Sequence, residues 1–206
     1  GALIGIVQKD VKSLVAYSSV AHLGFVMLGM FALTTQGITG SILQMVNHGI
    51  ATGALFFLVG IIYERRHTRL ISEFGGVAHV MPLYATVFLI VTLASIGLPG
   101  TNGFVGEFLI LLGTFKANPV YAVIGTFGIV LAAVYMLWMV QRVFFGKCDK
   151  EENKKLTDMN WRETLIAVPI VIMIFWIGIY PKAFTDKIEP SINKLIETVK
   201  MKAGMG

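Results

Sequence analysis

The sequence predicts an all-α fold, a polytopic bundle of transmembrane helices with one broken helix. Hydrophobic residues make up 55% of the chain and charged residues only 14%, and the mean hydropathy is +0.74. A chain this apolar does not suit a soluble domain of its size. Its basic residues lie in loops between the apolar runs, so the formal charge of +5 indicates membrane topology and argues against nucleic acid binding.

Apolar runs long enough to cross a bilayer, about 20 residues each, define the expected helices. Residues 1–8 are too short for this, so we expect them to be the end of a span and the chain to be the C-terminal part of a longer membrane domain. A tail at 190–202 has apolar side chains at amphipathic spacing, which predicts a helix on the membrane surface or on a neighbouring subunit. The expected complete helices are 13–33, 41–62, 80–115 with a break, 120–141 and 164–180.

The apolar run 80–115 is too long for one straight span, and its middle contains residues that interrupt helices. Proline removes a backbone donor and glycine permits non-helical dihedral angles. Unwound backbone at membrane depth is tolerated where protein or water satisfies it, and broken helices mark ion pathways in transporters. The residues of the expected break are Gly97, Pro99, Gly100 and Gly103.

Glu107, just after this break, is the main candidate for a functional residue. No other acid occurs between Glu73 and Asp149, and no Lys or Arg occurs between Arg69 and Lys116. An isolated ionisable group at membrane depth costs about 2.5–3.5 kcal/mol on insertion scales, which indicates a function. The competing interpretation is a protonated acid that only hydrogen-bonds into helix packing.

Two histidines within the expected spans, His22 and His48, complete a candidate proton pathway with Glu107. Histidine titrates near neutrality and can pass a proton from one ring nitrogen to the other. The competing interpretation for each is a packing residue with one hydrogen bond. Ser18 and Gln44 lie one helical turn before His22 and His48, where either could orient an imidazole or a water molecule. The supporting candidates are Lys12, Ser18, Gln44 and Asn47.

Cofactor-binding patterns are missing from the sequence. The single cysteine, Cys148, excludes an internal disulfide, and the Cys and His spacing does not suit a zinc or iron–sulfur site. No Gly-rich loop follows a strand to hold a nucleotide. We therefore expect no metal and no cofactor in this chain.

Four motifs, in this order, resemble the antiporter-like subunit M family of respiratory complex I, the NADH:quinone oxidoreductase. The glutamate of G-E-F favours subunit M, because the related subunits L and N carry lysine there. The motifs are D-V-K-S-L-V-A-Y-S-S-V-A-H-L-G, Q-M-V-N-H-G-I-A-T-G-A-L-F-F-L-V-G, Y-E-R-R-H-T-R and G-L-P-G-T-N-G-F-V-G-E-F.

The resemblance implies an antiporter-like fold of two inverted helical repeats and proton translocation coupled to electron transfer from NADH to quinone. His22 and His48 match histidines of the central hydrophilic axis, and Glu107 matches the terminal acid of the second half-channel. NADH, FMN, iron–sulfur clusters and quinone would bind other subunits, and the partners would be subunits L and N and the lipid bilayer. Because the first repeat is absent here, we do not expect this part to pump alone.

Loop charge predicts the orientation in the membrane. The loops rich in Lys and Arg are expected on the cytoplasmic or matrix side and the C-terminus on the outer face of a prokaryotic or mitochondrial inner membrane. Two other functions stay open. One is a subunit of an Mrp-type cation/proton antiporter or of a membrane-bound hydrogenase, and the other is a structural membrane scaffold.

Overall fold

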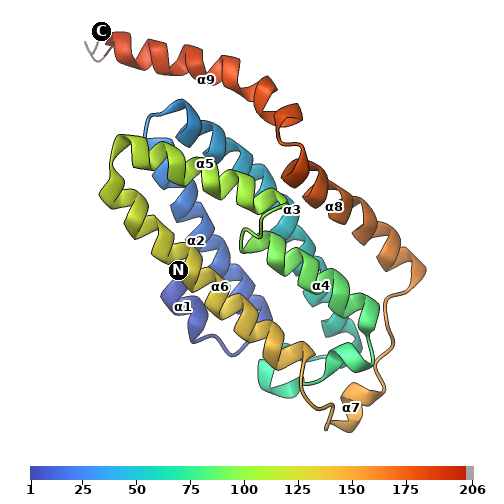
Figure 1. Ribbon diagram of the computed structural model, residues 1–206. Coiled ribbons are helices and arrows are strands. Elements are labelled where there is room, and N and C mark those ends of the chain that lie inside the picture. The colour runs from blue at the N-terminus through green and yellow to red at the C-terminus, as the bar shows by residue number, and fades with distance from the viewer. Residues whose placement is uncertain (203–206) are drawn as a thin grey trace.

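Every regular element of residues 1–202, the part of the chain that the computed structural model describes, is a helix (Figure 1). This confirms the all-α prediction. Four helices, α2, α3, α6 and α8, are long and apolar enough to cross a membrane. The elements are α1 (Ala2–Ile6), α2 (Val11–Phe31), α3 (Thr35–Arg66), η1 (Ile71–Glu73), η2 (Val77–His79), α4 (Pro82–Ser95), α5 (Asn102–Ala117), α6 (Pro119–Phe144), α7 (Glu151–Lys154), α8 (Trp161–Ile179) and α9 (Lys182–Lys202).

The start of α3 differs from the prediction. We expected a loop at 34–40, but α3 already begins at Thr35. The Thr34 side chain accepts a hydrogen bond from the backbone N–H of Gly37 at 3.1 Å and so caps the helix. The glycines that indicated a loop are helical because they pack against α5. Helices α2, α6 and α8 begin and end within three residues of their predicted bounds.

The predicted helix break is confirmed, and it separates α4 from α5. Gly97 and Gly100 have φ angles of +75° and +91°, in the left-handed region that favours glycine. Pro99 lies between them in the connecting turn, which is closed by a hydrogen bond from the Thr101 N–H to the Leu98 carbonyl at 3.0 Å.

Gly103 has a different role from the one predicted, because it lies inside α5 and not in the break. A Cβ atom there would overlap the carbonyl oxygen of Ala94 at the end of α4. Gly103 is therefore required for the close approach of the two half-helices and not for a special dihedral angle.

The amphipathic tail is longer than predicted, since α9 begins at Lys182 and continues through Pro190. A proline normally ends a sequence-based helix prediction because it removes a backbone donor. Ile192 is buried, and the Thr35 hydroxyl at the start of α3 donates a hydrogen bond to the Asn193 side chain at 3.0 Å. Figure 1 shows α9 running away from α8 at the end of the bundle opposite α7.

The loops at the α7 end of the bundle are joined by backbone hydrogen bonds. The Val11 N–H donates to the Arg69 carbonyl at 2.9 Å, and the Ile71 N–H donates to the Lys9 carbonyl at 2.8 Å. The segments after α1 and after α3 therefore lie side by side. These segments and the one that carries α7 hold most of the loop lysines and arginines, and they share one end of the bundle (Figure 1).

Ion pairs and caps strengthen this end. Arg65 forms two hydrogen bonds with the Glu163 carboxylate, at 3.0 and 2.7 Å, which join α3 to α8. The Asp158 carboxylate accepts hydrogen bonds from the N–H groups of Leu83 and Tyr84 at the start of α4. The helices α3, α4 and α8 are thus fixed to one another at the α7 end of the bundle.

The segment around α7 is fixed to η1 by charged side chains. Lys150 donates a hydrogen bond to the Glu73 carboxylate at 2.9 Å, and this bond lowers the pKa of Glu73. Arg66 donates to the Asn153 side chain at 2.8 Å. The α7 segment is therefore an ordered part of this end of the bundle.

Helices α3 and α5 pack closely through glycines. A Cβ atom at Gly113 would overlap the backbone of Gly37, and one at Gly40 would lie 2.7 Å from the backbone nitrogen of Ile110. Small residues allow membrane helices to approach in this way. This contact positions the start of α3 against α5, the helix that carries Glu107.

Replacement of Gly113 by Ala should destabilise the protein by about 1–3 kcal/mol, the range for overpacking a close contact. The matched control is Gly53→Ala, because nothing lies within 4 Å of the Cβ position of Gly53. The measurement is the thermal unfolding midpoint of the full-length parent subunit in detergent. Equal midpoints for the two variants would contradict the packing role of Gly113.

Candidate functional site

Glu107 lies in α5 near the break and is only 4% exposed. Its Oε1 atom is 3.3 Å from Nδ1 of His22 on α2. The same oxygen accepts a hydrogen bond from Nε2 of Gln44 on α3 at 3.4 Å. Side chains from two other helices therefore contact one buried carboxyl group, as a polar group in an apolar layer requires.

His48 is the next member of this polar group. Its ring centroid is 5.4 Å from that of His22, and its Nδ1 atom is 3.1 Å from the Thr52 hydroxyl. His22 contacts Glu107 directly, whereas His48 lies beyond His22. The structure thus brings the three predicted residues together, with His22 beside both Glu107 and His48.

Two supporting candidates have partners other than those expected. Ser18 donates its hydroxyl to the Val15 carbonyl at 2.7 Å, as helical serines commonly do, so it does not orient His22. Gln44 contacts Glu107 and not His48. The positions one turn before each histidine share a face with it, but the facing helix determines the contact.

Lys12 is not part of this polar group. It is exposed at the start of α2 and lines a separate pocket with Phe56, Tyr63 and Arg69. The structure therefore brings Gln44 to Glu107, and it leaves Lys12 at the α7 end of the bundle.

Asn47 ties α3 to the helix break. Its Nδ2 atom donates to the carbonyl oxygen of Asn102, the first residue of α5, at 2.7 Å. The break also touches the carboxyl group itself, because a Cβ atom at Gly97 would overlap Oε2 of Glu107. The position of Glu107 therefore depends on the shape of the broken backbone.

Several buried polar atoms here have no hydrogen-bond partner among residues 1–202. Such atoms are normally matched by water in proteins. Two of the residues that carry these atoms, Asn102 and Tyr135, were not among the site residues predicted from the sequence. The signal for Asn102 was its position directly after the Pro-Gly break, whereas Tyr135 is a tyrosine within an apolar run and gave no clear signal. The atoms are His22 Nε2, Gln44 Oε1, Asn47 Oδ1, both amide atoms of Asn102, and the Tyr135 hydroxyl.

A small cavity beside the carboxyl group has room for water. It lies between α2, α5 and α6, is lined by His22, Glu107, Phe25, Gly128 and Ala132 among others, and has a volume of about 30 Å³. A water molecule needs about 10–15 Å³ measured in this way. The cavity can therefore hold a water molecule against a wall that includes His22 and Glu107.

Metal ligands do not gather in this site. Within residues 1–202 there is no group of three or more His, Cys, Asp or Glu side chains that could hold a metal ion. The chemistry that the polar group can perform with its own residues is proton transfer between a carboxyl group and imidazoles.

Comparison with known proteins shows to which family the chain belongs. Residues 1–132 match the family described as "NADH:quinone oxidoreductase/Mrp antiporter, TM". The chain belongs to this family. The chain is 49% identical to NADH-quinone oxidoreductase subunit M of Rhodobacter capsulatus, over 95% of the chain and 38% of the relative. It is 44% identical to NADH-ubiquinone oxidoreductase chain 4 of Marchantia polymorpha, over 95% of the chain and 40% of the relative.

Solved structures of the NADH:quinone oxidoreductase/Mrp antiporter family share this fold. A chain of respiratory complex I from Thermus thermophilus with bound NADH matches at 33% identity and a TM-score of 0.90, over 95% of this chain and 41% of that one. A chain of the Mrp complex from Dietzia sp. DQ12-45-1b matches at 18% identity and a TM-score of 0.85, over 100% of this chain and 46% of that one, and shows the fold alone. The present chain spans about two fifths of the length of the curated relatives. The resemblance seen in the sequence motifs is confirmed.

Replacement of Asn47 by Leu should loosen the helix break, because it removes the hydrogen bond to the Asn102 carbonyl. Loss of a buried hydrogen bond costs about 1–3 kcal/mol, so we expect amide hydrogens of 98–103 to exchange about fivefold faster or more. Hydrogen–deuterium exchange of the full-length parent, read by mass spectrometry, measures this. Asn193→Ala, at the α9 end, is the control, and equal exchange in both variants would remove the role given to Asn47.

Proposed function

We propose that this chain is part of a membrane-arm subunit of NADH:quinone oxidoreductase that translocates protons, coupled to electron transfer from NADH to quinone in other subunits. The observation that supports this proposal is the buried contact of Glu107 with His22 and Gln44, beside a helix break, in a chain of this family. The electron-transfer groups, which are FMN and the iron–sulfur clusters, and the NADH and quinone sites belong to the other subunits. The proposed neighbours are the antiporter-like subunits L and N.

The proposed proton step takes place between Glu107 and His22. A proton moves from Oε1 of Glu107 to Nδ1 of His22, which converts a neutral pair into a carboxylate and an imidazolium. The Gln44 N–H donates a hydrogen bond to the same oxygen, Oε1. The imidazolium then releases the proton on its other nitrogen, Nε2, to water or toward His48.

This step responds to charge elsewhere in the membrane domain. In an interior of low dielectric constant, one unit charge acts on another far more strongly than it does in water. A charge that arrives near the ion pair of Glu107 and His22 therefore shifts the equilibrium between the neutral and the charged pair. Such coupling needs no redox group in this chain.

The orientation of the chain is also part of the proposal. The basic loops at the α7 end face the cytoplasm or the mitochondrial matrix, and α9 lies on the outer face of the inner membrane. The gathering of the lysine- and arginine-rich loops at one end supports this orientation. The 49% identity to a subunit M, against 18% to the Mrp chain, favours the respiratory function over cation/proton exchange.

Replacement of Glu107 by Gln should strongly reduce coupled activity, since the amide keeps the shape of the side chain but cannot ionise. We expect proton pumping and quinone reduction to fall by about tenfold or more, because a positioned proton-transfer group contributes about 10²–10⁴-fold. The measurement uses membrane vesicles that carry the full-length parent complex. The control is Glu189→Gln, which alters an exposed carboxyl group on α9.

Unchanged pumping by an assembled Glu107→Gln complex would overturn the proposal and leave the carboxyl group a packing residue in a scaffold. Sodium-dependent transport by the parent in a strain without complex I would instead support an antiporter or hydrogenase subunit.

Replacement of each histidine by Ala should reduce pumping less than loss of Glu107, since water can replace one relay member. We expect His22→Ala to reduce it more than His48→Ala, because only His22 contacts the carboxyl group. The initial rate of proton uptake, measured with a pH-sensitive dye in the same vesicles, ranks the variants. A complete loss in the His48 variant with an intact His22 variant would reverse the proposed order.

A further inference from the structure

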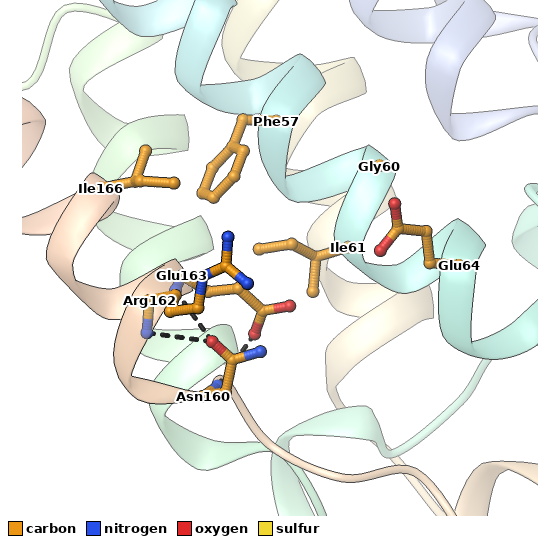
Figure 2. Close-up of a pocket in the computed structure, with 8 residues that line it drawn as sticks. All are labelled: Phe57, Gly60, Ile61, Glu64, Asn160, Arg162, Glu163 and Ile166. Atoms are coloured by element: carbon orange, nitrogen blue, oxygen red, sulfur yellow. Dashed lines mark hydrogen bonds between the residues drawn. The ribbon is translucent and has the colours of Figure 1, made fainter.

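A pocket of about 460 Å³ lies between α3 and α8 at the α7 end of the bundle (Figure 2). Pockets for small molecules commonly have about 300–1,000 Å³. Gly60 opens the space on the α3 side, because nothing lies within 4 Å of the position that its Cβ would take. The pocket is separate from the polar group around Glu107, and none of the residues there lines it.

Two opposite charges line the pocket. Glu64 comes from the last turns of α3 and Arg162 from the first turn of α8, and Figure 2 shows them on opposite sides of the space. Both side chains are exposed, and neither forms an ion pair or a side-chain hydrogen bond with any of residues 1–202. The neighbouring Glu163 is different, because its carboxylate is already paired with Arg65 at 2.7 Å.

The deeper wall of the pocket is apolar. Ile166 lies one helical turn beyond Arg162 in α8, and Phe57 lies two turns before Glu64 in α3. Both residues are nearer the middle of their helices than the charges are. Trp161, at the start of α8, is 74% exposed, and exposed tryptophans are enriched at the level of lipid headgroups. The pocket therefore changes from charged to apolar in the direction in which a lipid changes from headgroup to acyl chain.

We propose that this pocket binds a zwitterionic phospholipid with a primary ammonium group, phosphatidylethanolamine. The lipid phosphate pairs with the Arg162 guanidinium, which matches phosphate oxygens in a bidentate way. The ammonium group donates hydrogen bonds to the Glu64 carboxylate, and one acyl chain lies over Phe57, Gly60 and Ile166.

The charges of the pocket select this headgroup over two common alternatives. Phosphatidylcholine carries a quaternary ammonium, which has no N–H to donate to Glu64. Phosphatidylglycerol is anionic and carries no cation, so its headgroup would leave the Glu64 carboxylate unpaired next to a phosphate. Of the three headgroups, only ethanolamine offers both a phosphate for Arg162 and a cationic N–H donor for Glu64.

Photo-crosslinking tests this proposal on the full-length parent complex in lipid nanodiscs. Each sample contains a trace of phosphatidylethanolamine, phosphatidylcholine or phosphatidylglycerol with a diazirine in the acyl chain. Mass spectrometry then measures labelling of the peptides that contain Phe57 and Ile166. We expect about tenfold more labelling by the ethanolamine lipid than by the choline lipid, the ratio for about one charge-assisted hydrogen bond.

Single substitutions separate the two charges. Arg162→Gln should lower labelling by both the ethanolamine and the glycerol lipid, because each loses its phosphate partner. Glu64→Gln should lower labelling by the ethanolamine lipid and raise labelling by the glycerol lipid, because a repulsive charge is removed. Lys155→Gln is the control, since Lys155 is exposed at the same end but outside the pocket.

Equal labelling by the three lipids in the wild-type complex would overturn the proposal. Unchanged selectivity in both charge variants would also overturn it. Should a variant fail to assemble, the ranking of the three lipids in the wild-type complex decides alone. The readout does not depend on proton pumping, so it stands or falls separately from the proposed function.

Discussion

A carboxyl group buried in an apolar layer must have polar partners, and much of the architecture around Glu107 meets this requirement. His22 and Gln44 supply the partners from two other helices, and the break between α4 and α5 brings polar backbone near the same point. Unwound backbone at this depth has its own unsatisfied groups. Asn47 holds the start of α5 in place beside the break through its hydrogen bond to the Asn102 carbonyl. The broken helix and the buried acid are thus two parts of a single polar region.

The two ends of the bundle are stabilised in different ways. At the α7 end, ion pairs and backbone hydrogen bonds join loops that are distant in the sequence. At the α9 end, the contact of Thr35 with Asn193 joins the start of α3 to the last helix. Between them, the middle of the bundle depends on side-chain packing and on the polar region. The site therefore lies between two stabilised ends, in the layer where water is scarce.

The sequence was sufficient to predict the features that depend on local chemistry. The length of the run 80–115, with its glycines and proline, predicted the break, and the isolated charge identified Glu107. The predicted start of α3 was wrong, because glycines that pack against a neighbouring helix look the same in the sequence as glycines in a loop. The contact of Gln44 with Glu107 could not be predicted from the sequence either. Helical periodicity shows which side chains share a face but not which helix lies opposite that face.

The glycine contact between α3 and α5 has a mechanical consequence. With Gly113 packed directly on the backbone of Gly37, the two helices approach more closely here than any side chain at these positions would allow. The same close contact sets the spacing between Gln44 on α3 and Glu107 on α5. Within the proposed function, this close contact makes side-chain rotation and hydration at Glu107 and His22 the natural variables of the site.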